Sequence, residues 1–297
     1  MKRTLLFRGT GTALVTPFTQ TGVVDEAALK KIVEYQIKGG VEAIIPVGTT
    51  GEGATLSDEE QARVVAIVVH QAKGRVKIIA GAGSNSTSKA IEHAKTVLHE
   101  GADGILSVAP YYNKPTQEGF YQHYAAIASA IKAPIVMYNV PGRTASNLEA
   151  ATVLRLAGEF PNISGIKEAS GNFGQIMEII HNRPKGFGVW SGDDAITLPL
   201  IALGADGIIS VISNEAPKQF SDLVRYCLKG NFPKALDLHY KLLDLMNFNF
   251  IESSPIPVKA ALAMMGMIKE QYRLPLVSLS DKHKPKMKST LKELGLI

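Results

Sequence analysis

A lysine at the end of a predicted buried strand is the side chain in this sequence best suited to covalent chemistry. Ile163 and Ile166 belong to a short β-branched run, and Lys167 falls where that run ends. A lysine is costly to bury unless its pKa falls or a partner neutralises it. A desolvated lysine is partly neutral near pH 7, and its amine can attack a carbonyl to form a Schiff base. The pattern alone is weak evidence, because most lysines are solvated surface charges.

Other polar side chains follow other predicted strands. Thr49 and Thr50 lie among glycines in a loop whose amides and hydroxyls suit a carboxylate, although an ordinary capping turn fits equally well. Tyr138 ends the strand beside that of Lys167, where a phenol could exchange a proton with the amine through a threonine or a second tyrosine. It could instead be a core ring with a solvated hydroxyl. Arg143 could bind a carboxylate with two hydrogen bonds or form a surface ion pair.

The sequence predicts neither a metal site nor a bound cofactor. Its histidines fall on helical segments without metal-ligand spacing, and it contains no H-E-x-x-H, phosphate-binding loop or G-x-S-x-G motif. Asp193 and Asp194 could bind Mg²⁺, but the pair is more typical of a helix N-cap and a solvated turn.

Eight short β-rich runs alternate with longer amphipathic segments, and these elements must position the polar side chains. The predicted strands cover residues 11–18, 42–48, 76–83, 104–110, 134–140, 163–167, 186–192 and 207–213. This alternation predicts an α/β fold, a (β/α)8 TIM barrel over residues 1–230, with catalytic groups at the carboxyl ends of the strands. A doubly wound sheet fits less well, because no G-x-G-x-x-G motif follows the first strand.

Local signals place helices between the strands and after them. Asp25 is expected to cap the first helix, which stops at Gly39 and Gly40, and Ser57 forms a capping box with Glu60. Residues 231–297 contain two or three helical segments, which predict a C-terminal helical region packed on the barrel. That region could also form an oligomer contact, or it could only cover the barrel surface.

Composition narrows the class of protein. The 297 residues are 45% hydrophobic, which allows a large core, and their net charge is +5. Basic residues concentrate only at 282–292, interpreted as a solvated end, so we expect small anionic substrates and no nucleic-acid partner. The apolar N-terminal stretch is too short for a signal peptide, and the longest clear apolar run, 64–69, is too short to span a membrane. With a single cysteine, Cys227, the sequence predicts a soluble cytoplasmic protein.

Four motifs occur in order at the predicted strand ends. They are GTTGE (48–52), YYN (111–113), YNVPGRT (138–144) and GIKEAS (165–170). Together they resemble the 4-hydroxy-tetrahydrodipicolinate synthase (dihydrodipicolinate synthase) family. This family belongs to the class I pyruvate-dependent aldolases and lyases, which include N-acetylneuraminate lyase. The resemblance runs over essentially the whole chain, including the helical tail.

The resemblance implies an activity, an assembly and a set of site residues. Lys167 would form a Schiff base with pyruvate, and the derived enamine would attack L-aspartate 4-semialdehyde to give 4-hydroxy-tetrahydrodipicolinate. This reaction is the first committed step of the diaminopimelate route to lysine. The family is usually a homotetramer, a dimer of dimers. The implied catalytic residues are Lys167, Tyr138 as the acid and base, and Thr49 and Tyr112 as a proton relay, with Tyr112 reaching the neighbouring subunit's site. The implied substrate-binding residues are Thr50 and Arg143 for the two carboxylates, with Gly192 and Ile209 lining the pocket.

Arg143 favours a small acidic aldehyde over a sugar, because neuraminate lyases have no arginine at this place and typically carry GSTGE. The alternatives are a lyase for N-acetylneuraminate or 2-keto-3-deoxy sugar acids, and a non-catalytic sensor, which would be expected to lose Lys167 or Tyr138. Members that L-lysine inhibits carry a glutamate at the place of Lys89. A cation there repels the ammonium of L-lysine, so we predict weak or no inhibition.

Overall fold

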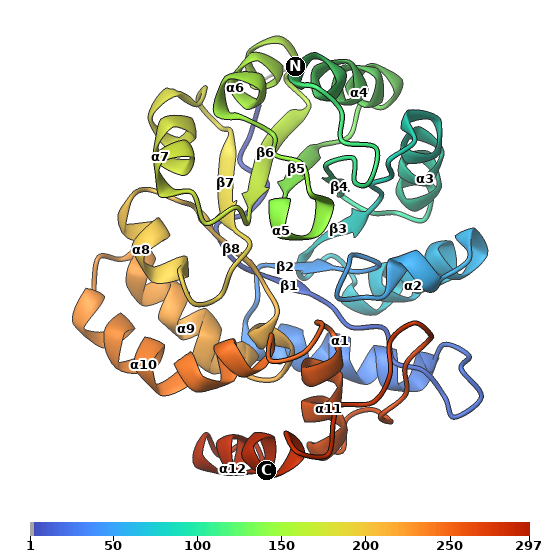
Figure 1. Ribbon diagram of the computed structural model, residues 1–297, viewed down its shortest axis with the longest axis vertical. Helices are drawn as coiled ribbons and strands as arrows, with labels where there is room; N and C mark the ends of the chain where they lie inside the picture. The colour runs from blue at the N-terminus through green and yellow to red at the C-terminus, as the bar shows by residue number, and fades with distance from the viewer. Residues whose placement is uncertain (1–2) are drawn as a thin grey trace.

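The computed structural model describes residues 3–297, and its centre is a closed barrel of eight parallel strands (Figure 1). Each strand pairs with the next one along the chain, and β8 pairs with β1 to close the barrel. The strands are β1 (Gly9–Ala13), β2 (Ala43–Ile45), β3 (Lys77–Gly81), β4 (Gly104–Val108), β5 (Ile135–Asn139), β6 (Ile163–Glu168), β7 (Gly188–Ser191) and β8 (Gly207–Ser210). The TIM barrel predicted from the sequence is therefore confirmed.

Helices follow the strands along the chain. They are α1 (Glu26–Gly39), α2 (Asp58–Ala72), α3 (Thr87–His99), α4 (Gln117–Ala130), the short α5 (Pro141–Thr144), α6 (Ala150–Glu159), α7 (Phe173–Asn182), α8 (Thr197–Ala202) and α9 (Pro217–Leu228). All of them except the short α5, which Figure 1 shows over the centre of the barrel, form the outer layer. Two 3₁₀ turns, η1 (Gly53–Thr55) and η2 (Ile212–Asn214), follow β2 and β8. The predicted caps are confirmed: Asp25 accepts a hydrogen bond from an amide of α1, and Ser57 and Glu60 form the capping box of α2.

Seven of the eight strands are shorter than the runs that predicted them, and β6 is one residue longer. The first run was expected to be a strand over 11–18, whereas β1 covers Gly9–Ala13. Val15 and Phe18 lie beyond the strand but are buried in the layer between barrel and helices. The chain therefore stays apolar after the ladder of hydrogen bonds has stopped, and hydrophobicity alone does not mark the strand end.

The barrel interior is filled by large side chains near its amino end. Trp190 stacks on Phe7, with ring centroids 4.8 Å apart. A Cβ at Gly165 or Gly188 would lie 2.5 or 2.3 Å from the Trp190 ring, so these two glycines make the room for it. This packing closes the amino end and leaves the polar groups at the carboxyl ends of the strands.

Three more helices follow the barrel, drawn orange to red in Figure 1: the first packs on α9, and the third contacts the other two. They are α10 (Phe232–Phe248), α11 (Ile256–Met264) and α12 (Lys284–Glu293). Leu242, Val258 and Leu291 of these helices join the same apolar core as the barrel helices. A barrel over 1–230 with a separate helical region over 231–297 therefore stays a prediction. No helix within residues 3–297 is long and apolar enough to cross a membrane.

Candidate active site

Lys167 lies near the carboxyl end of β6, in register with Tyr138 on β5 and Trp190 on β7. Its side chain points into the barrel and the residue is only 6% exposed. Burial lowers the pKa of Lys167 from 10.5 to about 7, while attraction by Asp194 raises that pKa and repulsion by Arg143 lowers it. About half of the amines are therefore neutral at pH 7 and can act as nucleophiles.

Tyr138 lies directly beside this amine. The Lys167 Nζ atom is 4.3 Å from the centroid of the Tyr138 ring. Burial raises the pKa of Tyr138 to about 12, an effect that the nearby charge of Arg143 partly offsets. The phenol is therefore protonated at neutral pH and can donate a proton to a group that reacts at Nζ.

Gly192 and Ile209 border the same part of the barrel. A Cβ at Gly192 would lie 3.0 Å from the Lys167 Cε atom and 2.7 Å from the Ala169 Cβ atom. The space beside the lysine therefore depends on the missing side chain at position 192. Ile209 is fully buried in the interior apolar cluster that also contains Tyr138.

The loop after β2 holds Thr49 and Thr50 in a tight turn, called here the threonine turn (residues 48–52). Thr49 is exposed and Thr50 is buried. The turn is closed by backbone hydrogen bonds, among them one from the Glu52 amide to the Thr49 carbonyl. Val47, which precedes the turn, and Glu52, its last residue, have φ values of +52° and +53°. A β-branched residue rarely adopts this region, so the surrounding structure must stabilise the turn.

Arg143 and Tyr112 lie at the rim. Arg143 belongs to the short helix α5 and is exposed. Its side chain donates a 3.4 Å hydrogen bond to the Ser254 carbonyl. Tyr112 is 88% exposed and has a φ of +72°. Lys167, Tyr138, Gly192 and Ile209 therefore come together within one chain, whereas Tyr112 stands out from the surface.

The prediction for Asp194 was wrong. It was expected in a helix N-cap or a solvated turn, but the residue is buried, and its Oδ2 atom accepts hydrogen bonds from the amides of Val211 and Ile212 at 3.2 and 3.0 Å. Asp194 thus joins the ends of β7 and β8, and burial raises its own pKa to about 6. Only its neighbour Asp193 makes the local turn, by accepting a hydrogen bond from the Ala195 amide. Sequence gives no signal for which of two adjacent carboxylates turns inward.

Glu168 was also missed. It follows Lys167 on β6 and points to the opposite face, where it is fully buried. Its carboxylate accepts hydrogen bonds from the side-chain amides of Asn139 and Gln175 and from the Ser170 amide, at 3.2, 3.1 and 2.8 Å. These bonds fix the strand that presents the lysine. The sequence does hold a signal for Glu168: on two neighbouring strands, a polar residue directly follows the residue that points into the barrel. These pairs are Tyr138-Asn139 and Lys167-Glu168.

Metal ligands do not gather at the site: within residues 3–297, no group of three or more His, Cys, Asp or Glu could hold a metal ion. The expectation of no metal site and no bound cofactor stays a prediction. The site thus consists of a buried, partly neutral amine beside a protonated phenol, with a threonine turn and an arginine at its rim.

Residues 6–294 match the Dihydrodipicolinate synthetase family. The chain belongs to this family. It is 52% identical to the 4-hydroxy-tetrahydrodipicolinate synthase of Chlorobium phaeobacteroides over 97% of this chain and 98% of that one. The dihydrodipicolinate synthase of Thermotoga maritima is 45% identical and superimposes with a TM-score of 0.96, over 98% of this chain and all of the other. A monomeric dihydrodipicolinate synthase variant, also 45% identical, has a TM-score of 0.96 over 98% of both chains. The family resemblance of the four motifs is confirmed.

Proposed function

We propose that this chain is a lyase that condenses pyruvate with L-aspartate 4-semialdehyde to give 4-hydroxy-tetrahydrodipicolinate. The observation behind this proposal is the buried Lys167 amine, with a pKa of about 7, against the Tyr138 ring. This chain has both groups, and it matches a named synthase of the family over nearly its full length. The product enters the diaminopimelate route to lysine.

The reaction follows from the chemistry of these two groups. The neutral amine of Lys167 attacks the keto carbon of pyruvate, and the carbonyl oxygen leaves as water after accepting protons by way of Tyr138. Loss of a methyl proton from the imine gives an enamine, whose carbon forms a bond with the aldehyde carbon of the semialdehyde. The amino group of the semialdehyde then replaces Lys167 at the imine carbon, which closes the ring and frees the lysine.

The remaining residues have proposed roles in binding and proton transfer. Thr49 and Tyr112 would extend the proton relay from Tyr138, and Thr50 with its amide would bind the pyruvate carboxylate. Arg143, exposed at the rim, would bind the carboxylate of the semialdehyde with two hydrogen bonds. Gly192 and Ile209 would line the pocket for pyruvate. No cofactor enters any of these steps.

The exposed Tyr112 supports an assembly in which subunits complete one another's sites. A tyrosine that is 88% exposed in a single chain contributes to a buried relay only if a neighbouring subunit covers it. We therefore propose that the chain forms a homotetramer, a dimer of dimers. We also propose that it acts in the cytoplasm and has no nucleic-acid or membrane partner. Sedimentation velocity checks the assembly; a fully active monomer would refute the shared relay.

The alternatives are lyases for sugar acids and a non-catalytic sensor. Arg143 beside the site favours a small acidic aldehyde, and the retained Lys167 and Tyr138 favour an enzyme over a sensor. Within the family, the named relative reported above is a synthase. We therefore place the condensation above both alternatives.

Borohydride trapping with pyruvate tests the proposed function. Reduction of the imine should leave a stable adduct on Lys167, identified by intact and peptide mass, and Lys167→Ala should give none. Rates with L-aspartate 4-semialdehyde and with sugar aldehydes then decide the second substrate. A folded, oligomeric sample without an adduct would overturn the proposal.

A further inference from the structure

A buried ion pair joins the threonine turn to the C-terminal helices. Glu52, the last residue of the turn, pairs with Lys259 of α11, and both side chains are 0% exposed. The Lys259 Nζ atom also lies over the rings of Phe18 and Tyr272, 4.3 and 5.1 Å from their centroids. Either charge would be costly if it were left buried without the other, so the two groups hold each other in place.

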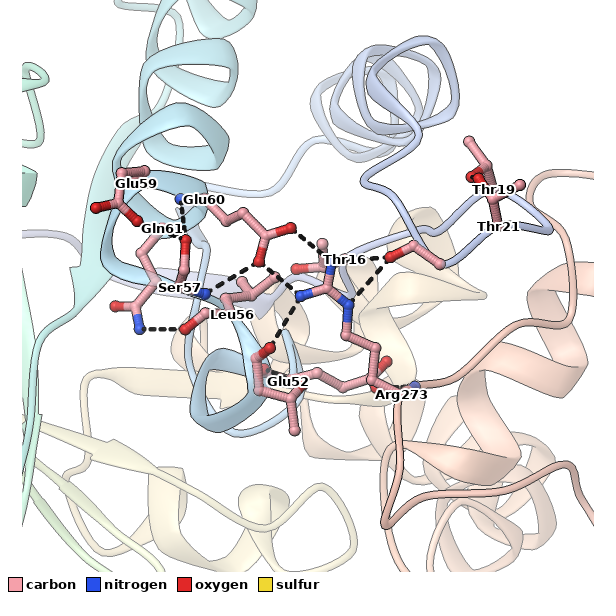
Figure 2. A network of polar contacts seen from close by, with 12 residues as sticks. Thr16, Thr19, Thr21, Glu52, Leu56, Ser57, Glu59, Glu60, Gln61 and Arg273 are labelled. Carbon is pink, nitrogen blue, oxygen red and sulfur yellow. Dashed lines mark hydrogen bonds and ion pairs between the residues drawn. The ribbon is translucent and has the colours of Figure 1, made fainter.

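Arg273 binds the same Glu52 and also the segments around the turn (Figure 2). Its backbone amide donates a hydrogen bond to the Glu52 carboxylate at 3.2 Å. Its guanidinium binds both carboxylate oxygens of Glu60 at 2.6 Å and the carbonyl oxygens of Gly22 and Thr55 at 2.8 and 2.9 Å. One residue from the segment after α11 thus joins the turn, the start of α2 and the loop before α1.

The threonine turn needs such support because the residue before it and its own last residue are strained. Val47 and Glu52 occupy the left-handed region of backbone space, at φ values of +52° and +53°. The surrounding structure must stabilise these values, since non-glycine residues rarely adopt them. Thr49 and Thr50 lie between the two strained residues, so their positions depend on whatever fixes Glu52.

We propose that Lys259 and Arg273 are positioning residues for pyruvate binding, because they fix Glu52 and with it the turn that presents Thr49 and Thr50. The identity of the ligand rests on the proposed function. The C-terminal helices would then contribute to pyruvate affinity without touching the substrate. The position of Lys167, which is held by other strands, would not depend on them.

The ion pair could instead contribute only to stability, and the choice of variants separates the two roles. In Glu52→Gln with Lys259→Met, both charges are removed together, so no unpaired buried charge remains. Arg273→Ala removes the guanidinium bonds to Glu60, Gly22 and Thr55, which hold in place the backbone amide that binds Glu52. Its side chain is partly exposed, so this variant provides a second route if the double variant fails to fold. Arg183→Gln is the matched control, because Arg183 pairs with Asp206 at the amino end of the barrel.

Pyruvate-dependent trapping gives the first readout. We expect the pyruvate concentration for half-maximal trapping to rise about tenfold or more in the double variant, since small displacements of binding groups have effects of this size. The pH midpoint of trapping should stay near that of the unmodified chain, because other strands hold Lys167, whereas the rate at saturating pyruvate should fall only as far as displacement of Thr49 weakens the proton relay. The control should lower the melting temperature without changing the pyruvate dependence. A half-maximal concentration within twofold of the unmodified chain, in both the double variant and Arg273→Ala, would overturn the inference.

Hydrogen exchange gives a readout that needs no substrate. The amides of Glu52, Gly53 and Thr55 donate the hydrogen bonds that close the turn, and their exchange should quicken in the double variant and in Arg273→Ala but not in Arg183→Gln. Unchanged exchange would refute the attachment itself. If the unmodified chain forms no pyruvate adduct, the proposed function fails. If the adduct forms and its pyruvate dependence is unchanged in the variants, only the inference fails.

Discussion

Replacing Lys167 with methionine should abolish imine formation and make the folded protein more stable. Burial lowers the pKa of this amine from 10.5 to about 7, because the folded state disfavours the charged form. Through proton linkage, this shift corresponds to about 4 kcal/mol of destabilisation at pH 7. Methionine fills a similar volume without the charge, but it also loses the attraction of Asp194. We therefore expect a net gain of about 1–3 kcal/mol.

The gain should depend on pH in a defined direction. Between about pH 7 and 10.5 the unfolded chain binds a proton at Lys167 that the folded chain has lost, so the stability of the unmodified protein rises with pH. Below about pH 7 both states bind the proton and the penalty is fully present. The methionine variant has no such group. Its advantage should therefore be largest below pH 7 and shrink as pH approaches 10.5.

Urea unfolding at pH 6.5, 8 and 9.5, followed by far-ultraviolet circular dichroism at one protein concentration, measures these differences. Lys259→Met is the matched control, because the same substitution there leaves Glu52 buried without a partner and should destabilise by about 3–5 kcal/mol. A Lys167→Met variant that is less stable than the unmodified protein at pH 6.5, or an advantage that does not shrink with pH, would refute the reasoning.

Three further predictions concern the site and its regulation. The rate of pyruvate trapping should rise with pH to a plateau, with a midpoint near pH 7. Asp194→Asn should lower that midpoint, because the Asp194 carboxylate raises the pKa of Lys167. Mass spectrometry across a pH series checks both results. Gly192→Ala should destabilise by about 1–3 kcal/mol and slow trapping at saturating pyruvate, because its Cβ would lie 2.7 Å from that of Ala169 and 3.0 Å from the lysine Cε; thermal melts and trapping report each effect. L-Lysine should leave the rate nearly unchanged, since the exposed Lys89 repels an ammonium ion; inhibition at millimolar L-lysine in a rate assay would contradict this.

The sequence predicted the order of the strands and the position of the lysine, because both follow from local patterns. Apolar runs and helix caps are patterns of neighbouring residues. Eight strands that alternate with helices are compatible with only a few folds. Strand ends were less predictable. Val15 and Phe18 are as apolar as the strand before them, because they are buried in the core between the barrel and the helices.

Long-range partners had no local signal. Glu52 and Lys259 are separated by 207 positions, and nothing near either residue predicts a buried pair. The inward turn of Asp194 was hidden for a similar reason, because its partners are the amides of Val211 and Ile212 at the end of another strand. Charge alone places a carboxylate on the surface, and only the folded chain provides the donors that let it be buried.

Two buried lysines show why residue type and burial do not by themselves define a catalytic amine. Lys259 is fully buried, but Glu52 neutralises it, so the pair attaches one segment to another. Lys167 is buried as well, yet within residues 3–297 no carboxylate forms an ion pair with it, and Asp194 acts only from a distance. Its neighbours are a phenol ring and the gap left by Gly192. Burial lowers the pKa of Lys167 to about 7, so part of the amine is neutral and can act as a nucleophile.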